Sequence, residues 1–278
     1  MIDTLSLAEG LETLGVRPGA IILVHASLRG LGAAPDVVLA ALRHVLGPEG
    51  TLVVPAFTAG NSDTSRTYRE ATRHMTARQR AEHLADLPPF DPATTPSEGM
   101  SRLSETVRRG NGAVRSGHPQ TSFAALGARA AELMAGHDEE CHLGEHSPLA
   151  RLYDAGADVL LLGVGYDVCS AFHLAEYRVQ GAPWKEYGCA VLRNGERYWM
   201  SYNDVDLDDE DFGALGAAFE EDDIRSPRPV VRRGRVGHAE ARMFPVERAV
   251  DFAVTWMAGN RPLGIHPDPS QNASRFLH

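Results

Sequence analysis

Short, continuous apolar runs alternate along the chain with segments whose apolar residues recur at helical spacing. Runs of the first kind predict buried strands, and they occur at residues 21–25, 50–58, 122–126 and 159–162. The second pattern, with its proline and glycine boundaries, predicts helices at about 3–15, 36–46, 100–109, 128–135, 171–178, 212–221 and 246–257, and one starting near 145. Strands that alternate with helices are typical of an α/β fold.

The pattern changes in the C-terminal half of the chain. Asn194-Gly195 separates two strand-like segments, 189–193 and 196–202, and this arrangement predicts a β-hairpin. A further strand is predicted at 242–246. The sequence therefore indicates a small antiparallel region in addition to the buried strands.

Other stretches lack a clear apolar period. Residues 59–100 are polar, and a loop this long inside a compact domain is usually functional or disordered, so we expect it to face a substrate. Residues 203–211 form a strongly acidic run, and 228–235 form a basic one. The tail from Gly264 onward is rich in Pro and Ser, and we expect it to fray.

Composition and charge narrow the classes of function. Lys and Arg total 27 while Asp and Glu total 37, so the formal net charge is −10 and nucleic acid is a disfavoured partner. Surplus carboxylates suit a cationic ligand, and they equally suit plain solubility. The three cysteines show no framework spacing, and neither a signal peptide nor a run of membrane-spanning length is found. We therefore expect a soluble, cytoplasmic protein without a membrane partner.

One candidate for catalysis follows the strand at 159–162. Two glycines end this strand, and Ser170 is placed to cap the next helix. His173 then falls in the first turn, with Glu176 three residues further along the same face. The positive end of the helix dipole disfavours a protonated ring, so His173 is a candidate general base. Asp167 and Glu176 are both close enough in sequence to hold that ring.

Two other interpretations of His173 remain open. The ring could simply pack and form local hydrogen bonds. Alternatively, His173 and Glu176 could form a His-x-x-Glu metal pair. No second His/Cys pair at ligand spacing completes such a site, so the sequence favours no metal.

A second candidate follows the strand at 21–25. The loop of small residues and the helix start after it could cradle a phosphate with backbone N–H groups. Arg29 could add a charge-assisted hydrogen bond to a pyrophosphate. Arg29-x-x-Gly32-x-Ala34 also matches the short coenzyme A loop pattern of GNAT acetyltransferases. A tight structural turn is the alternative interpretation.

Taken together, the segments resemble the antibiotic N-acetyltransferase family, the aminoglycoside 3-N-acetyltransferases. The similarity is spread in order over about residues 5–258, and it rests on the combination of several short motifs. These are 24–32 (VHASLRGLG), 50–58 (GTLVVPAFT), Arg115-Ser116 with His118-Pro119, 122–127 (SFAALG), 147–149 (SPL), and 161–165 (LLGVG) running on to His173 and Glu176.

The resemblance implies one domain over residues 1–278, distinct from the GNAT fold. Its expected architecture is α/β, a three-layer αβα arrangement with a central mixed sheet and a smaller antiparallel β region in the C-terminal half. It implies acetyl-coenzyme A as cosubstrate, no metal, and transfer to the 3-amine of a 2-deoxystreptamine aminoglycoside, which gives antibiotic resistance. Segments 59–100 and 185–225 are expected to be variable and substrate-facing. We expect a monomer or a homodimer.

Carried over position by position, the resemblance assigns roles to named residues. His173 matches the family's catalytic histidine, with Asp167 and Glu176 as its acidic neighbours. The expected cofactor contacts are Ser27, Leu28, Arg29, Gly30, Pro55, Phe57, Thr58 and Ser122. Thr58 and Ser122 are expected at the acetyl-thioester end. We hypothesise direct transfer without an acyl-enzyme, because Cys169 is the only thiol nearby and suits a packing role.

The acceptor would be a polycation, so carboxylates should line its site. The substrate contacts we expect are Asp63, Tyr68, Glu98, Glu186, Asp206, Glu220 and Glu221. An acyltransferase of the same family with another amine acceptor, such as a biosynthetic intermediate, is the alternative. The intact Asp167/His173/Glu176 set speaks against a non-catalytic binding protein. The lack of a Gly-x-Ser-x-Gly elbow before a helix speaks against a Ser or Cys hydrolase.

Overall fold

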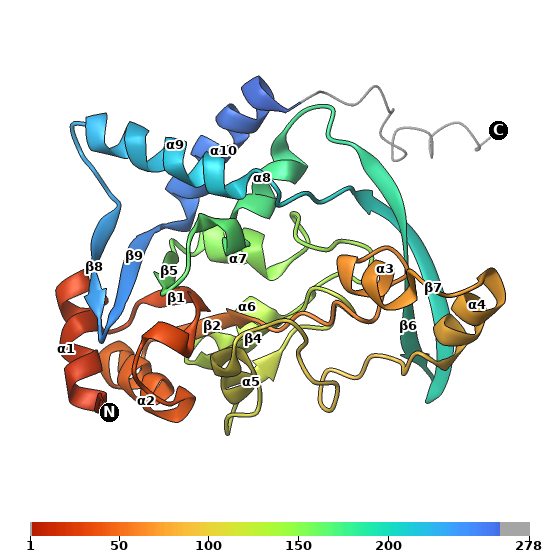
Figure 1. The fold of residues 1–278 in the computed structure, drawn as a ribbon. Helices are drawn as coiled ribbons and strands as arrows, with labels where there is room; N and C mark the ends of the chain where they lie inside the picture. The colour runs from red at the N-terminus through yellow and green to blue at the C-terminus, as the bar shows by residue number, and fades with distance from the viewer. Residues whose placement is uncertain (1, 262–278) are drawn as a thin grey trace.

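A seven-stranded mixed sheet, in the order β3-β4-β2-β1-β5-β9-β8, forms the centre of the molecule (Figure 1). The computed structural model describes residues 2–261, so the tail expected to fray lies outside it. Three buried strands lie parallel at the centre: β1 (Ile21–Ala26), β2 (Thr51–Pro55) and β5 (Asp158–Leu162). Antiparallel strands extend the sheet at both edges: β4 (Phe123–Gly127) and β3 (Val114–Arg115) beyond β2, and β9 (Ala239–Pro245) and β8 (Arg232–Val236) beyond β5.

Helices cover both faces of this sheet. One face carries α1 (Thr4–Leu14), α2 (Pro35–Leu46) and α5 (Arg102–Arg108). The other carries α6 (Ala130–Met134), α7 (Pro148–Asp154), α8 (Phe172–Arg178), α9 (Phe212–Arg225) and α10 (Val246–Asn260). Successive β5 side chains enter opposite cores: Leu160 packs toward the first set of helices, and Leu161 toward the second. The expected three-layer αβα architecture is confirmed.

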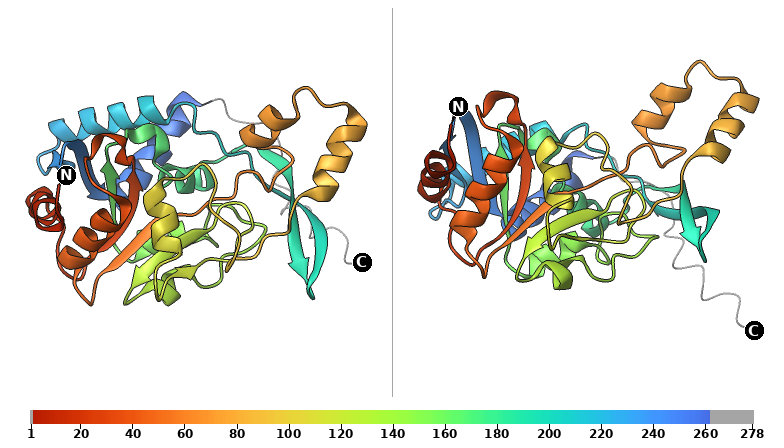
Figure 2. Two further views of the ribbon diagram at one scale, coloured as in Figure 1. Left: turned by 60° about the horizontal axis from the view of Figure 1, so that its bottom comes forward. Right: turned by 90° about the horizontal axis from the view of Figure 1, so that it is seen from below.

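The predicted hairpin is confirmed and is longer than expected. Strands β6 (Trp184–Arg193) and β7 (Glu196–Val205) pair over ten residues each. Asn194 and Gly195 take positive φ values of 54° and 82°, as a two-residue hairpin turn requires. Figures 1 and 2 show the hairpin at the end of the molecule opposite α1 and α2.

One prediction about an irregular segment, the long loop at 59–100, is wrong. Residues 59–100 contain α3 (Arg66–Thr72) and α4 (Ala77–Asp86), which lie beside the hairpin (Figure 2). Both helices start at capping side chains, Ser65 and Thr76. Helix α4 has no buried residue, so its sequence shows no periodic apolar pattern that would predict a helix. The basic run contains the edge strand β8, where charged residues are compatible with an exposed edge.

The remaining predicted helices lie within about one turn of the observed ones. Across residues 2–261, the structure has no helix with both the length and the apolar character that a membrane crossing requires.

Helix α9 packs closely on the turn that leads from β5 into α8, and Gly216 makes this possible. A Cβ at Gly216 would lie 2.0 Å from Cγ of Tyr166, which is buried and hydrogen-bonded to Glu220. We expect Gly216→Ala to lower the free energy of unfolding by about 1–3 kcal/mol, because the ring must move.

Gly213, in the same helix, is the matched control, since a Cβ there would meet nothing within 4 Å. Gly213→Ala should be neutral or stabilising by up to about 1 kcal/mol, because alanine favours the helix. Urea denaturation of both variants measures the difference. Equal effects at the two positions would contradict this account of the packing.

Candidate active site

His173 and Glu176 form a direct hydrogen bond in the first turns of α8. Nδ1 of His173 lies 2.6 Å from Oε2 of Glu176, whose side chain is only 3% exposed. Oε1 of the same carboxylate accepts from the backbone N–H of Asp208 at 2.9 Å and from Arg261 at 2.5 Å. Because a carboxylate accepts at Nδ1, that nitrogen carries the proton and Nε2 presents a lone pair.

The ring of His173 borders a cleft of about 530 Å³. Its side chain is 13% exposed, and Phe212 packs against it with 4.7 Å between ring centroids. Within residues 2–261, no protein group hydrogen-bonds Nε2. The arrangement therefore supplies a proton acceptor that a bound molecule can reach.

The other residues expected around His173 behave differently. Asp167 lies in the short 3-10 turn Tyr166–Val168, is exposed, and makes no hydrogen bond to His173 among the described residues. Ser170 does not cap α8, since the N-cap position falls on Ala171. The carboxylate that holds the ring is Glu176, because helical spacing brings it under His173 while the turn directs Asp167 to solvent. No group of three metal-ligating side chains is found within the described part of the chain.

Ser170 instead contacts a buried histidine that the sequence did not single out. Nε2 of His25, at the end of β1, lies 3.2 Å from the Ser170 hydroxyl. Burial, followed by the proximity of His173, lowers the pKa of His25 to about 3. His25 is therefore a neutral ring close to the first one, and its position was hidden because 145 residues separate it from Ser170.

A second cavity of about 150 Å³ runs beside His25. Pro55, Phe57 and Ala26 line it together with Val168. Phe57 also lines the cleft of His173, so the two cavities lie on either side of this residue. Pro55 and Phe57, two of the expected cofactor contacts, therefore lie where a narrow ligand could approach His173.

The loop expected to meet the cofactor follows directly after Ala26. Leu28–Gly30 form a 3-10 turn, with Arg29 and Gly30 exposed and Ser27 half-buried. Ala26, directly before this loop, lines the second cavity, whereas Ser27, Leu28, Arg29 and Gly30 are not among its lining residues.

Thr58 and Ser122 do not occupy the positions expected of them. Both are fully buried, and neither lines the two cavities. The Thr58 hydroxyl donates to the Pro119 carbonyl, and the Ser122 hydroxyl donates to the Ala56 carbonyl at 2.9 Å. These hydrogen bonds connect the segments that follow β2 with those that precede β4, and they give both buried hydroxyls a partner.

The acidic side of the cleft differs from the expected one. Asp208, Asp209 and Glu210 line it, from the acidic run that follows the hairpin. None of the seven expected substrate contacts is among the lining residues. Most have structural partners. Asp63 and Glu98 accept hydrogen bonds from the backbone N–H groups of Gly188 and Gly60, respectively. Asp206, Glu220 and Glu221 form ion pairs with Lys185, Arg242 and Arg225, respectively, the Tyr68 ring lies near that of His83, and Glu186 is exposed on β6.

Cations also border this cleft. Arg66 and Arg69 reach it from α3, and Lys185, the only lysine of the chain, reaches it from β6. The Lys185 ammonium lies 4.7 Å from the centre of the Tyr187 ring and pairs with Asp206. A molecule bound here would therefore meet both signs of charge.

Three buried histidines join the hairpin to the sheet next to the cleft. The ring of His118 lies 4.9 Å from that of His137 and 4.5 Å from that of His142. Nε2 of His142 lies 2.7 Å from the hydroxyl of Tyr202 on β7. Burial lowers the pKa of His137 to about 4, and it lowers the pKa values of His118 and His142 well below the ordinary value.

These neutral rings make stability depend on pH. In the unfolded chain a histidine binds a proton below about pH 6.5, whereas the buried rings do not, so the folded state loses free energy as the pH falls from about 6.5 toward about 4. Each ring contributes up to about 1.4 kcal/mol per pH unit. We expect His137→Gln to reduce this slope by close to one proton in urea denaturation between pH 6 and 5, where the unfolded imidazole is largely protonated and the buried ring is not.

His146, which is exposed, provides the control for that measurement. His146→Gln should leave the slope unchanged. An identical slope for wild type and His137→Gln would mean that His137 is protonated in the folded protein.

Known proteins resemble this chain over most of its length. Residues 23–258 match the family model described as aminoglycoside 3-N-acetyltransferase. Aminoglycoside N(3)-acetyltransferase VII of Streptomyces paromomycinus is 38% identical over 274 residues, which cover 90% of each chain.

Solved structures with the same fold include two that bear on the site. The YokD protein of Bacillus subtilis has a TM-score of 0.85 at 32% identity, covering 94% of this chain and 100% of its own. AAC-IIIb, solved as a binary complex with CoASH, has a TM-score of 0.79 at 29% identity, covering 96% and 99%.

Proposed function

Because the chain belongs to the aminoglycoside 3-N-acetyltransferase family, we propose that it transfers the acetyl group of acetyl-coenzyme A directly to the 3-amine of a 2-deoxystreptamine aminoglycoside, and thereby confers resistance. One observation carries this proposal. His173, hydrogen-bonded to Glu176 through Nδ1, borders a cleft that shares Phe57 with a second, narrower cavity. An acceptor and an acyl donor can therefore approach the same nitrogen from two sides.

The chemistry requires a base. Aminoglycoside amines are largely ammonium groups near neutral pH, and only an unprotonated amine attacks a thioester. Nε2 of His173 accepts the proton of the attacking amine, and the Glu176 carboxylate stabilises the resulting imidazolium. As the C–N bond forms, the C–S bond of the thioester breaks, and coenzyme A leaves as a thiol that takes the proton from the imidazolium. Such a base typically contributes roughly a hundred- to ten-thousand-fold in rate.

Direct transfer is favoured over an acyl-enzyme by the state of the nearest thiol. Cys169 is fully buried, and this burial raises its pKa to about 12. A thiol nucleophile must be deprotonated to attack, so Cys169 is unsuited to carry an acetyl group. It packs in the core beneath α8 instead.

The cavity beside His25 suits the thioester arm of acetyl-coenzyme A. Its walls combine apolar groups, such as Val168 and Phe57, with the hydroxyls of Ser101 and Ser104. The Ser27–Gly30 loop follows Ala26 of this cavity directly, and it would offer backbone N–H groups and Arg29 to the phosphates. The related AAC-IIIb was solved with CoASH, which supports coenzyme A as the cosubstrate.

The acceptor site is proposed to lie in the larger cleft. Asp208, Asp209 and Glu210 are exposed there, and none of them forms an ion pair with another described residue. Carboxylates without cationic partners are suited to bind the ammonium groups of an aminoglycoside.

A second acceptor class is favoured by the cations of the same cleft. Arg66 and Arg69, which form no ion pair among the described residues, would repel a highly charged aminoglycoside, whereas Lys185 is paired with Asp206. An amine with fewer positive charges, such as a biosynthetic intermediate, would bind with less repulsion. Both acceptors would use His173 in the same way.

Release of free thiol from acetyl-coenzyme A distinguishes these proposals. The assay compares 2-deoxystreptamine aminoglycosides with simple amines, and NMR of the product identifies the acylated nitrogen. Thiol release with aminoglycosides and acetylation at the 3-amine support the first proposal, as does a raised inhibitory concentration in a susceptible bacterium. Release only with other amines supports the second, and no release with any amine contradicts both.

We expect His173→Ala to lower kcat by roughly a hundred- to ten-thousand-fold while leaving coenzyme A binding intact, because the base is lost and the cofactor cavity is not. Steady-state kinetics and calorimetric titration with coenzyme A measure the two effects. His146→Ala is the control for loss of a histidine. Wild-type kcat in His173→Ala would rule out His173 as the base.

We expect Asp209→Asn and Glu210→Gln each to raise KM for an aminoglycoside by roughly five-fold, which corresponds to about 1 kcal/mol for a partly exposed charge pair. Glu221→Gln should leave KM unchanged, since Glu221 pairs with Arg225 on α9. KM values measured at low and at high salt test this, because salt should reduce the difference between variants and wild type.

A further inference from the structure

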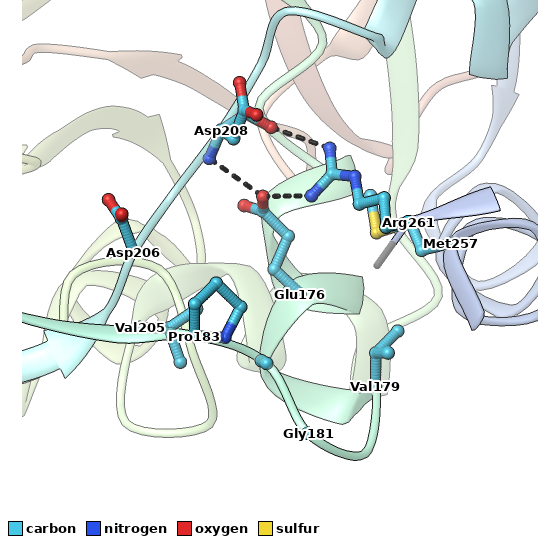
Figure 3. A pocket seen from close by; sticks show the side chains of 10 residues that line it. Glu176, Val179, Gly181, Pro183, Val205, Asp206, Asp208, Met257 and Arg261 are labelled. Atoms are coloured by element: carbon cyan, nitrogen blue, oxygen red, sulfur yellow. Dashed lines mark hydrogen bonds and ion pairs between the residues drawn. The ribbon is translucent and has the colours of Figure 1, made fainter. Parts of the chain in front are cut away.

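Arg261 binds the carboxylate oxygen of Glu176 that does not contact His173. It follows α10 directly and lies three residues beyond the end of the family match at residue 258. Its guanidinium donates to Glu176 Oε1 at 2.5 Å, as Figure 3 shows. Since Glu176 holds His173 through its other oxygen, Arg261 is one step removed from the proposed base.

The same guanidinium also holds the segment that carries the cleft carboxylates. It binds both carboxylate oxygens of Asp211, at 2.8 and 2.5 Å, and it donates to the backbone carbonyl of Asp208 at 2.7 Å. Asp208 in turn donates its N–H to Glu176 (Figure 3). Arg261 therefore connects the end of α10, the catalytic pair of α8 and the residues 208–211 in one network.

This geometry depends on the shape of the arginine side chain. A guanidinium presents several donors in one rigid plane, whereas an ammonium is a compact point charge. Only the former can bind Asp211 with two hydrogen bonds and still reach Glu176 and the Asp208 carbonyl. Its position beside the buried Glu176 carboxylate also offsets part of the negative charge that faces His173.

We propose that Arg261 is a positioning residue for the acetyl transfer: it fixes Glu176 against His173 and sets the position of the acidic segment at the acceptor cleft. This inference rests on the proposed function. According to this proposal, Arg261 positions both the histidine that accepts the proton and the acidic residues that bind the amine substrate. Its loss should therefore affect kcat and KM together.

The charge on His173 is set by all the groups that face it. Glu176 binds the ring at Nδ1, and Arg261 binds Glu176 in turn. His25 and His142 are close enough to the ring to interact with it electrostatically. The charged groups that share its cleft are Asp208, Asp209, Glu210, Lys185, Arg66 and Arg69. Among these groups, Arg261 is the cation that contacts the Glu176 carboxylate.

Arg261→Ala tests the proposal directly. We expect kcat to fall at least ten-fold and KM for the aminoglycoside to rise several-fold. The acidic limb of the pH profile of kcat/KM should move to higher pH, because the uncompensated Glu176 charge favours the protonated ring. Circular dichroism and thermal unfolding establish that the variant is folded.

Arg261→Lys separates charge from shape. The lysine keeps the positive charge, so the acidic limb of the pH profile should stay near its wild-type position. The planar set of guanidinium donors is lost, so KM should still rise. Arg225→Ala is the matched control, since Arg225 makes an exposed ion pair on α9 and should change neither quantity.

Chemical rescue provides an independent measurement. A cavity of about 140 Å³ adjoins Arg261, Glu176, Asp208 and Met257 (Figure 3), so shortening the Arg261 side chain to alanine would enlarge an existing cavity. Guanidinium chloride at tens of millimolar should raise kcat of Arg261→Ala, whereas urea, its neutral analogue, and sodium chloride should not. An equal response to all three additives would overturn the proposal.

Two further outcomes for Arg261→Ala would overturn it. The first is a wild-type kcat with the acidic limb of the pH profile in its wild-type position. The second is a loss of activity that is explained by a lowered unfolding temperature, again with the acidic limb in its wild-type position. Failure of the proposed function is distinguishable from both. Activity that persists in His173→Ala contradicts the base itself, whereas an inactive His173→Ala beside an unaffected Arg261→Ala contradicts only the role of Arg261.

Discussion

The buried carboxylate of Glu176 is the constraint on which the active site depends. A carboxylate removed from water is costly unless donors satisfy it, and three separate segments supply these donors. His173 donates from the same helix, the backbone of Asp208 from the segment after the hairpin, and Arg261 from the end of α10. The need to satisfy one side chain therefore brings together the base, the acidic wall and the last helix. It also fixes which ring nitrogen faces the cleft.

A second constraint comes from uncharged imidazoles. The hairpin meets the sheet across His118, His137 and His142, which are buried too deeply to be protonated near neutral pH. Gln120 and Tyr202 complete this contact with a hydrogen bond between their side chains. Because His142 and Gln120 also line the cleft, the joint between sheet and hairpin forms part of the cleft wall. The position of the hairpin is thus coupled to the shape of the proposed acceptor site.

The sequence predicts the central fold well because its signals are local. Buried strands are continuous apolar runs, and the hairpin turn is marked by Asn194-Gly195. Glu176 was found as a partner of His173 because helical spacing is itself local. The failures have the opposite origin: α4 buries no residue and so shows no apolar period, and β8 is an arginine-rich edge.

Contacts between distant segments leave no spacing to detect. His25 and Ser170 are 145 residues apart, and Glu176 and Arg261 are 85 residues apart. The hydroxyls of Thr58 and Ser122 looked suited to a thioester, yet backbone carbonyls already bind them. Whether a side chain has a partner is decided by the fold, and the sequence alone could not decide it.

The same reasoning explains why net charge was a poor guide to the acceptor site. Asp206, Glu220 and Glu221 belong to an acidic region, but each is neutralised by a cation: Lys185, Arg242 and Arg225 respectively. Residues 208–210 belong to the same region and lack such partners among the described residues. A cationic ligand is attracted by carboxylates whose charge is not already compensated, so only this short part of the acidic run can select it. The uncompensated cations of the cleft, Arg66 and Arg69, then limit how many positive charges an acceptor can carry, because they repel ammonium groups that lie beyond the reach of residues 208–210.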